Sequence, residues 1–425
     1  RGLDGERRLF GGDRLDPASG WYPMAIDGAS CTICHTIADD PTLGTAAGFS
    51  GGYVIDESRR IFGQYDDPFT MMMQRQVDYT PTGSRHISSS ELCATCHELR
   101  TPFVDAAGNL VPPSEAEYFP EQAPYSEWGH SAFREGGTKE KSCADCHLAT
   151  LDGVRIANRP PWLTARQGFA RHLIVGSNTF LQTLVRDNRA ALGAPAANYD
   201  GAIAATRALL REGAAVTVEK PLLAGSTLSF DVVAVNKGGH KLPTSYPSRR
   251  AFLTVTVTDA TGIVVFSSGA VGDDGAVAGD DGATDPAAYE PHHDLIVEAG
   301  QVQIYEPVMG NSDREVTHTL LRAARYLKDN RLLPEGFDKR TAPAAAQVVG
   351  GALADDDFTG GSDRVTYRLA VAGAAPYTIR VALNYQTLSQ PFARDLAVDA
   401  ADPVVAQGVS SIAGGGSRTE TLAEA

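Results

Sequence analysis

Cys143-Ala144-Asp145-Cys146-His147 is one of three copies of a Cys-x-x-Cys-His pattern around which the chain is organised. The other two copies are Cys31-Thr32-Ile33-Cys34-His35 and Cys93-Ala94-Thr95-Cys96-His97. In this pattern the two thiols add across the vinyl groups of one porphyrin, and the adjacent histidine is placed to ligate the iron. The spacing therefore predicts three covalently attached haem c groups, each with an iron atom.

All 6 cysteines of the chain are used by these motifs, so none is left for a disulfide. Zinc knuckles are a poor alternative because zinc takes four ligands, which three such motifs cannot supply. A thioredoxin-like redox pair needs a βαβ context, and none surrounds the motifs. The predicted attachment residues are Cys31, Cys34, Cys93, Cys96, Cys143 and Cys146, and the predicted proximal iron ligands are His35, His97 and His147.

The length and charge of the chain restrict its class. With 425 residues it is too long for one ordinary core, so two domains are expected. Its formal charge of −15 argues against nucleic acid and against an anionic membrane surface as partners, and would suit a basic redox partner. No apolar run approaches the roughly 18 residues of a transmembrane segment.

Covalent haem is attached outside the cytoplasmic membrane. We therefore expect the protein to be exported, with a secretory signal removed before Arg1. The expected location is the periplasm, the cell surface or the extracellular space.

The first part of the chain, residues 1–196, is loop-rich, and three porphyrins would supply most of its core. A helix is expected over 178–193, with an asparagine N-cap and a final glycine; its apolar stripe is Leu181, Leu184, Val185 and Leu192. A second helix, over 200–212, lies in a predicted helical linker, 197–214.

In residues 215–396 the pattern of the sequence changes, and apolar residues recur at every second position. Alternating apolar residues in short runs, separated by Gly and Asp turns, predict strands with one buried face. The expected fold is thus a loop-rich, partly helical multihaem cytochrome domain followed by an all-β immunoglobulin-like sandwich.

Two acidic loops, 269–286 and 355–363, are expected to be solvated rather than to bind calcium, since neither has EF-hand spacing. The tail, 397–425, is expected to be extended or disordered. The apolar runs are 228–232, 253–257, 365–371 and 379–385.

A haem iron whose sixth position is filled by a protein ligand suits electron transfer, whereas an iron with an open sixth position can bind a substrate. His240 is the strongest candidate, because two glycines and a proline around it predict a turn that can approach a flat cofactor. His172, among apolar neighbours, is expected to be buried, and His86 is tethered close to the second motif. The alternative for each is a surface or hydrogen-bonded structural histidine. His130 ranks fourth, and the methionine run 71–73 is expected to pack rather than to ligate.

The chain resembles secreted multihaem c-type cytochromes of anaerobic, often metal- or sulfur-respiring, bacteria. The resemblance covers most of the chain between Gly28 and about Gln386 and implies bis-histidine iron, with His86, His172 and His240 at the matching positions. His130 and His318 lie outside the pattern. The stretches that carry it are HISSSELCATCH (86–97), PEQAPYSEW (120–128), NKGGHKLPT (236–244), PSRR (247–250), QVQIYE (301–306) and YLKDNRLLPEGFDK (326–339).

Three closely tethered haems with two histidines each predict an electron-transfer protein, because six-coordinate iron has no place for a substrate. Its expected partners are other redox proteins or extracellular acceptors. The alternative is a multihaem oxidoreductase with one open haem site. A third interpretation, compatible with the first, is a subunit of a homo-oligomer or cytochrome filament.

Overall fold

The structure is a computed structural model that describes residues 18, 20, 23, 30–111, 114, 117–190, 194–398 and 418–425. The chain forms two compact units, Arg1–Thr95 and Cys96–Ala425. This division falls inside the second motif, whereas the sequence predicts one at the linker 197–214. The domain boundaries 1–196, 197–214, 215–396 and 397–425 remain predictions. Among the described helices, none has the length and apolar character that a bilayer crossing requires.

The first unit consists of short elements joined by turns. Its strands β1 and β2 pair in parallel. In the described part of this unit the buried apolar side chains are Ile37, Phe62 and Ala94, a small core that agrees with the predicted loop-rich segment. The elements are α3 (Cys31–His35), β1 (Arg60–Gly63), α4 (Met71–Val77), β2 (Thr80–Gly83), the 3-10 helix η1 (Arg85–Ser88) and most of α5 (Ser90–His97).

The second unit begins with short helices and two-stranded pairs. β3 pairs with β4 and β5 with β6, both antiparallel. The elements are β3 (Leu99–Thr101), β4 (Phe119–Gln122), α6 (Pro124–Gly129), α7 (Cys143–His147), β5 (Thr150–Leu151), β6 (Phe169–Ala170), α8 (Thr179–Asp187) and α9 (Tyr199–Glu212).

Helix α8 starts where the sequence predicts, because the Asn178 side chain accepts a hydrogen bond from the Leu181 amide at 2.9 Å. It ends at Asp187 instead of extending to 193; residues 191–193 lie outside the described part. The predicted apolar stripe is wrong in part: Leu181 is 42% exposed, and the buried residues are Thr179 and Phe180. Helix α8 packs against α9, and Gln182 of α8 contacts Thr206 of α9.

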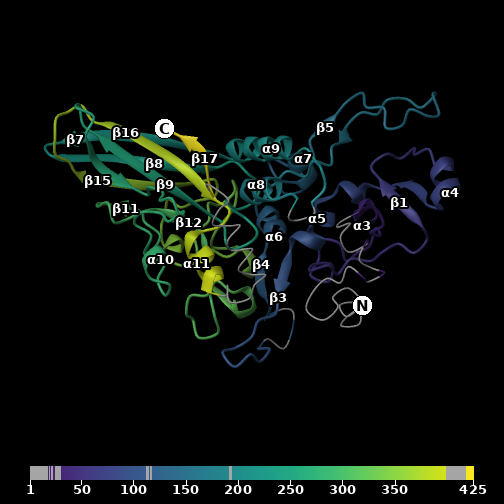
Figure 1. Cartoon of the computed structure of the whole chain (residues 1–425), viewed down its shortest axis with the longest axis horizontal. Helices are drawn as coiled ribbons and strands as arrows, with labels where there is room; N and C mark the ends of the chain where they lie inside the picture. Colours follow the sequence, from purple (N-terminus) through teal and green to yellow (C-terminus); the bar gives the residue numbers. More distant parts are fainter. Residues whose placement is uncertain are drawn as a thin grey trace. The chain divides into compact units, whose positions relative to one another are not determined.

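Two larger sheets follow in the second unit (Figure 1). The four-stranded sheet has the order β11-β15-β8-β7, and the five-stranded sheet has the order β10-β9-β16-β17, with β12 also pairing with β9. All neighbours are antiparallel except β11 and β15. The strands are β7 (Ala214–Ala224), β8 (Thr227–Asn236), β9 (Arg250–Thr258), β10 (Val264–Ser268), β11 (Leu295–Ile296), β12 (Ile304–Tyr305), β15 (Ser362–Ala370), β16 (Thr378–Gln386) and β17 (Thr419–Glu424).

One hydrophobic core joins the two sheets. It contains the alternating residues of β8 and β15 from one sheet and those of β9 and β16 from the other. Phe230 and Tyr367 stack on neighbouring strands with ring centroids 5.0 Å apart. The period-two prediction is confirmed for these four strands. The parallel β11–β15 pair departs from an all-antiparallel arrangement, and the immunoglobulin-like topology remains a prediction.

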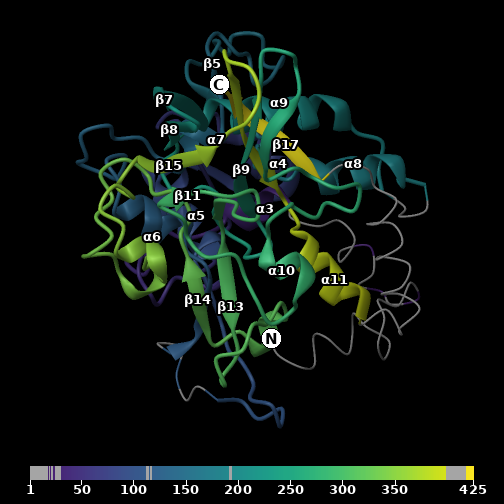
Figure 2. The same ribbon diagram turned by 90° about the vertical axis from the view of Figure 1, so that its left-hand side faces the viewer.

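Shorter elements complete the second unit. β13 and β14 form an antiparallel pair, which Figure 2 shows side by side. The elements are α10 (Asp281–Thr284), β13 (Pro307–Gly310), η3 (Leu320–Arg322), β14 (Arg325–Asp329), η4 (Ala344–Ala346), η5 (Gly351–Leu353) and α11 (Gln390–Val398).

The two acidic loops are not solvated throughout, contrary to the prediction. Asp280 is 4% exposed, and its carboxylate pairs with the buried guanidinium of Arg250 at 2.6 Å. Asp363, the second residue of β15, has no exposed surface. Burial of these two carboxylates requires compensation, which arginine supplies for Asp280.

The tail is ordered in the part that the structure describes. Residues Thr419–Glu424 form β17, which pairs antiparallel with β16, and Leu422 is buried. The Arg207 guanidinium on α9 binds the Glu420 carboxylate at 2.9 Å. An extended tail is therefore confirmed for β17, and its partner is a strand of the same chain; residues 399–417 lie outside the described part.

We expect Leu253→Ala to destabilise the β-sheet core. Leu253 is fully buried on β9, so removing its side chain should lower the free energy of unfolding by about 2–5 kcal/mol. Ile263→Ala, at a residue 63% exposed, is the control and should change it by less than about 0.5 kcal/mol. Urea unfolding followed by circular dichroism measures both; equal effects would contradict the proposed core.

Candidate functional site

Each Cys-x-x-Cys-His motif forms a short helix or the end of one: α3, α5 and α7. In a helix, residues three and four apart lie on one face, so the two cysteines and the histidine of a motif can meet one ligand. All 6 cysteines lie among the described residues, and no disulfide joins them. Four of them are exposed and two are partly buried. The thiols are therefore placed for attachment to a group outside the chain.

The third motif is held in place by its cap. Ser142 Oγ accepts a hydrogen bond from the Asp145 amide at 3.2 Å, and the Asp145 carboxylate accepts one from the Ser142 amide at 2.7 Å. This capping box satisfies the amide groups at the start of α7. It uses a residue between the two cysteines, so the sequence of the spacer stabilises the helix.

The histidines of the first and third motifs have the tautomer that a metal needs. His35 Nδ1 lies 2.5 Å from the carbonyl oxygen of Phe62, and His147 Nδ1 lies 2.7 Å from that of Val175. A carbonyl can only accept, so Nδ1 carries the proton and the lone pair is on Nε2. This is the usual outer-shell arrangement of a metal-ligating histidine.

His240 lies opposite His147. The two ring centroids are 6.2 Å apart and the ring planes are within 12° of parallel. Imidazole nitrogens bind zinc at about 2.0–2.1 Å, so two imidazoles on opposite sides of one such metal have centroids about 6 Å apart. His240 Nδ1 donates to the carbonyl oxygen of Lys241 at 2.9 Å, which again places the lone pair on Nε2. The separation of the two rings is therefore close to that of two imidazoles that hold one metal ion between them.

The setting of His240 keeps its imidazole neutral. Burial lowers the pKa of His240, and the charges of His147 and Arg249 act in the same direction. The Lys241 carbonyl and the Glu127 carboxylate oppose this shift. A neutral imidazole is the form that binds iron.

A buried charge cluster fixes the turn that carries His240. The Glu127 carboxylate on α6 accepts hydrogen bonds from the Lys241 amide at 3.1 Å and from Thr244 Oγ1 at 2.6 Å. Glu127 also pairs with Arg331 at 2.9 Å, and Lys241 Nζ pairs with Asp329 at 2.8 Å. These four charged residues, Glu127, Lys241, Asp329 and Arg331, are called the buried charge cluster below. Burial opposes ionisation of Asp329, but Arg331 and Lys241 outweigh it and lower its pKa to about 2.

The histidines of the second and third motifs, His97 and His147, both lie in the second unit. Desolvation lowers the pKa of His97, and the charges of His147 and Arg249 lower it further. Glu98, directly after His97, is buried, and its carboxylate accepts hydrogen bonds from the amide and the hydroxyl of Ser126 on α6.

The structure gives an additional reason to consider His130, fourth in the sequence ranking, as a distal iron ligand. His130 follows α6, and its Nδ1 donates to the carbonyl oxygen of Ser126 at 3.0 Å. Its lone pair is therefore on Nε2, as in His147 and His240. Because Ser126 also binds Glu98, α6 links His130 to the second motif. Sequence spacing could not show this link.

His86 is buried, and both of its ring nitrogens have partners. Nε2 donates to the carbonyl oxygen of Ile37 at 2.9 Å, and Nδ1 accepts from Ser84 Oγ at 2.7 Å. Its ring also meets the edge of Phe62, whose carbonyl binds His35. These contacts match the hydrogen-bonded alternative for His86, and a ligand role for this histidine stays a prediction.

His172 is exposed, and the prediction that it is buried is wrong. Its apolar neighbours Leu173 and Ile174 are 41% and 65% exposed, so they form no shell around the imidazole. Its segment nevertheless runs beside the third motif, because the Val175 carbonyl binds His147. The structure brings His172 near that motif without showing a ligand geometry.

The methionine run is exposed instead of packed, contrary to the prediction. Met71, Met72 and Met73 on α4 are 41%, 50% and 38% exposed. Other large apolar side chains are also exposed. They are Ile33, Val54, Ile55 and Val77 in the first unit, and Leu151, Ile156, Trp162, Leu173, Ile174 and Leu181 in the second. Thiols, imidazoles with the lone pair on Nε2 and exposed apolar side chains together fit the chemistry of a porphyrin.

Comparison with known proteins gives a likeness of fold. No protein-family model matches the chain, and no curated protein matches it. A solved structure, that of a penta-heme cytochrome c552 from Thermochromatium tepidum, is similar with a TM-score of 0.52 and 15% sequence identity. The match covers 97% of this chain and 79% of that chain. The chain therefore shares its fold with a multihaem c-type cytochrome.

Proposed function

We propose that the protein is an electron-transfer c-type cytochrome with three covalently attached haems. The observation that carries the proposal is the facing pair His147 and His240, whose spacing suits two axial ligands of one iron. An iron bound on both sides can exchange electrons but has no position for a substrate. The three attachment motifs and the fold of a multihaem cytochrome support the same function.

The residues of the chain have separate roles in this proposal. The cysteine pairs hold the porphyrins, and the carbonyls of Phe62 and Val175 orient His35 and His147. The buried charge cluster keeps His240 at a fixed distance from His147, which limits rearrangement when the iron changes its oxidation state.

The distal ligands of the other two irons are less well supported. For the second haem we propose His130, with His172 as the alternative, because α6 connects His130 to the second motif. His86, the sequence candidate beside the first and second motifs, could ligate only after losing its bond to the Ile37 carbonyl. The exposed methionines of α4 are a further source of a ligand for the first haem.

We propose an exported protein of the periplasm or cell surface, since c-type haem is attached outside the cytoplasmic membrane. The formal charge of −15 favours basic redox proteins as partners. Extracellular acceptors and assembly into a homo-oligomer or filament belong to the same proposal.

The second candidate function is a reductase or oxidase at the first haem, favoured by the hydrogen-bonded state of His86.

The purified protein should carry three haems that survive denaturation. The double variant Cys143→Ala and Cys146→Ala should retain two, because it removes one pair of attachment thiols. The control Ser142→Ala weakens only the cap of α7 and should retain three. Intact-protein mass spectrometry measures the number; fewer than three in the native protein would contradict the proposal.

His240→Ala should convert one haem of the three from low-spin to high-spin, and His240→Met should raise the reduction potential of that haem. Methionine favours the reduced iron more than imidazole does. Electron paramagnetic resonance and a redox titration follow both changes. The control His318→Ala, outside the motifs, should leave all three haems unchanged; an unaltered spectrum in the His240 variants would show that another residue binds the third iron.

His86→Gln tests the first haem. If His86 is structural, all low-spin signals should persist, because glutamine preserves a donor and an acceptor near Ile37 and Ser84. Loss of one low-spin signal would show instead that His86 is an iron ligand. A high-spin haem in the native protein, combined with binding of nitrite or cyanide, would instead favour the oxidoreductase.

A further inference from the structure

Two groups of potential metal ligands that share Asp355 lie in the second unit. Oxygens of Asp294, Asp355 and Asp357 lie within 4.8 Å of one another. A second group with the same spacing consists of His292, Asp355 and Asp363. Asp294 precedes β11, Asp355 and Asp357 follow η5, and Asp363 is on β15, which pairs with β11. Strand pairing thus brings the segments together.

One of these carboxylates has a buried oxygen without a hydrogen bond. Asp363 has no exposed surface, and its Oδ2 accepts from Tyr305 Oη at 2.7 Å and from Gln303 Nε2 at 3.1 Å. Its Oδ1 has no hydrogen-bond partner among the described residues. Leaving such an oxygen unsatisfied is costly, so a buried cation beside it would supply the missing interaction.

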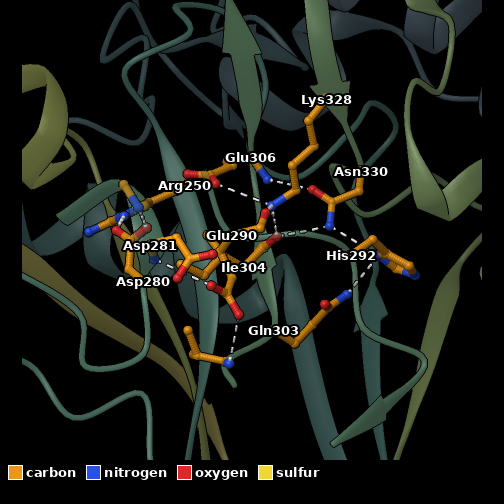
Figure 3. Close-up of polar contacts among 12 residues, drawn as sticks. Arg250, Asp280, Asp281, Glu290, His292, Gln303, Ile304, Glu306, Lys328 and Asn330 are labelled. Atoms are coloured by element: carbon orange, nitrogen blue, oxygen red, sulfur yellow. Dashed lines mark hydrogen bonds and ion pairs between the residues drawn. The ribbon is translucent and has the colours of Figure 1, made fainter. Parts of the chain in front are cut away.

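The tautomer of His292 restricts which cation fits. Its Nδ1 faces Gln303 Nε2 at 2.9 Å and Asn330 Nδ2 at 3.0 Å; Figure 3 shows both side chains directed at the ring. The amide oxygens of Gln303 and Asn330 accept from the backbone amides of His293 and Glu306, which fixes both amide groups as donors to His292. Nδ1 must therefore accept, and Nε2 carries the proton.

The proton on Nε2 makes His292 a donor and not a metal ligand. Nε2 donates to Asp355 Oδ2 at 2.9 Å and so orients that carboxylate. The available ligands are then carboxylate oxygens alone. Oxygen-only sites suit hard cations such as Ca²⁺, whereas Zn²⁺ and Cu²⁺ favour sites with nitrogen or sulfur ligands.

The charge and spacing of the cluster agree with Ca²⁺. Calcium binds oxygens at about 2.3–2.6 Å, so ligands of one ion lie up to about 5 Å apart. Burial, followed by repulsion from Asp355, Asp363 and Asp294, raises the pKa of Asp357 to about 6. The neighbouring Lys339 Nζ donates to the backbone carbonyls of Ala352 and Asp355.

We propose that the protein binds one Ca²⁺ ion through Asp294, Asp355 and Asp357, with Asp363 beside Asp355 and His292 orienting Asp355. The ion ties the turn at 355–357 to strand β15 and to the segment before β11. This site is independent of the haem motifs, and its function is to stabilise the sheets.

The test uses the full-length haem-loaded protein after treatment with EGTA. Calorimetric titration with CaCl₂ should give one site per chain, and added Ca²⁺ should raise the Tm. Asp357→Asn should weaken Ca²⁺ binding at least tenfold. The matched control is Asp356→Asn, in the same turn but with a 95% exposed side chain, and it should bind like the native protein.

Three results would overturn the proposal. The first is the absence of a Ca²⁺-dependent heat and Tm shift in the native protein, and the second is an equal loss of binding in both asparagine variants. The third is binding of Zn²⁺ in place of Ca²⁺ that disappears in His292→Gln, because the imidazole would then be a ligand. Circular dichroism of Asp357→Asn verifies its folding, and the haem content is measured separately, so failure here leaves the electron-transfer proposal untouched.

Discussion

The buried charge cluster is the constraint on which the geometry of the candidate haem site depends. Its four members come from α6, the turn after β8, and β14 with the residues beyond it, and they balance two positive charges against two negative ones. Removal of one partner from such a cluster is expected to cost about 3–5 kcal/mol, because an opposite charge is left buried and unpaired. The turn of His240 therefore cannot shift without disturbing the cluster.

The cluster also explains why the β-sheet part belongs to the functional site. Glu127 on α6 accepts hydrogen bonds from the Lys241 amide and from Thr244 in the turn that carries His240. Helix α6 also contributes Ser126, whose amide donates to Glu98, the residue after the second motif. The same short helix thus connects the surroundings of His97 with the surroundings of His240. The proposed bis-histidine iron takes one ligand, His147, from a motif helix and the other, His240, from a loop between strands.

Local patterns in the sequence predict much of this structure. The motif spacing indicates the attachment residues, and the alternation of Phe230 and Val232 predicts a strand with one buried face, which β8 has. The glycines around His240 predict a turn, and the structure places its ring 6.2 Å from that of His147. The hydrogen bond of His86 to Ile37 and the link from His130 to Glu98 could not be predicted, because they depend on residues far away in the sequence. The apolar neighbours of His172 predict that it is buried, which is wrong, because they are themselves exposed in the structure.

The 6.2 Å separation of His147 and His240 has a consequence for folding. An iron held by both imidazoles is a cross-link between a motif helix and a turn much later in the chain. Like a disulfide, such a bond restricts the unfolded chain, and the effect grows slowly with the length of the loop that it closes. Insertion of the third haem and closure of the turn after β8 would then be cooperative events, and reversible loss of the axial bond would be the first step by which the two segments separate.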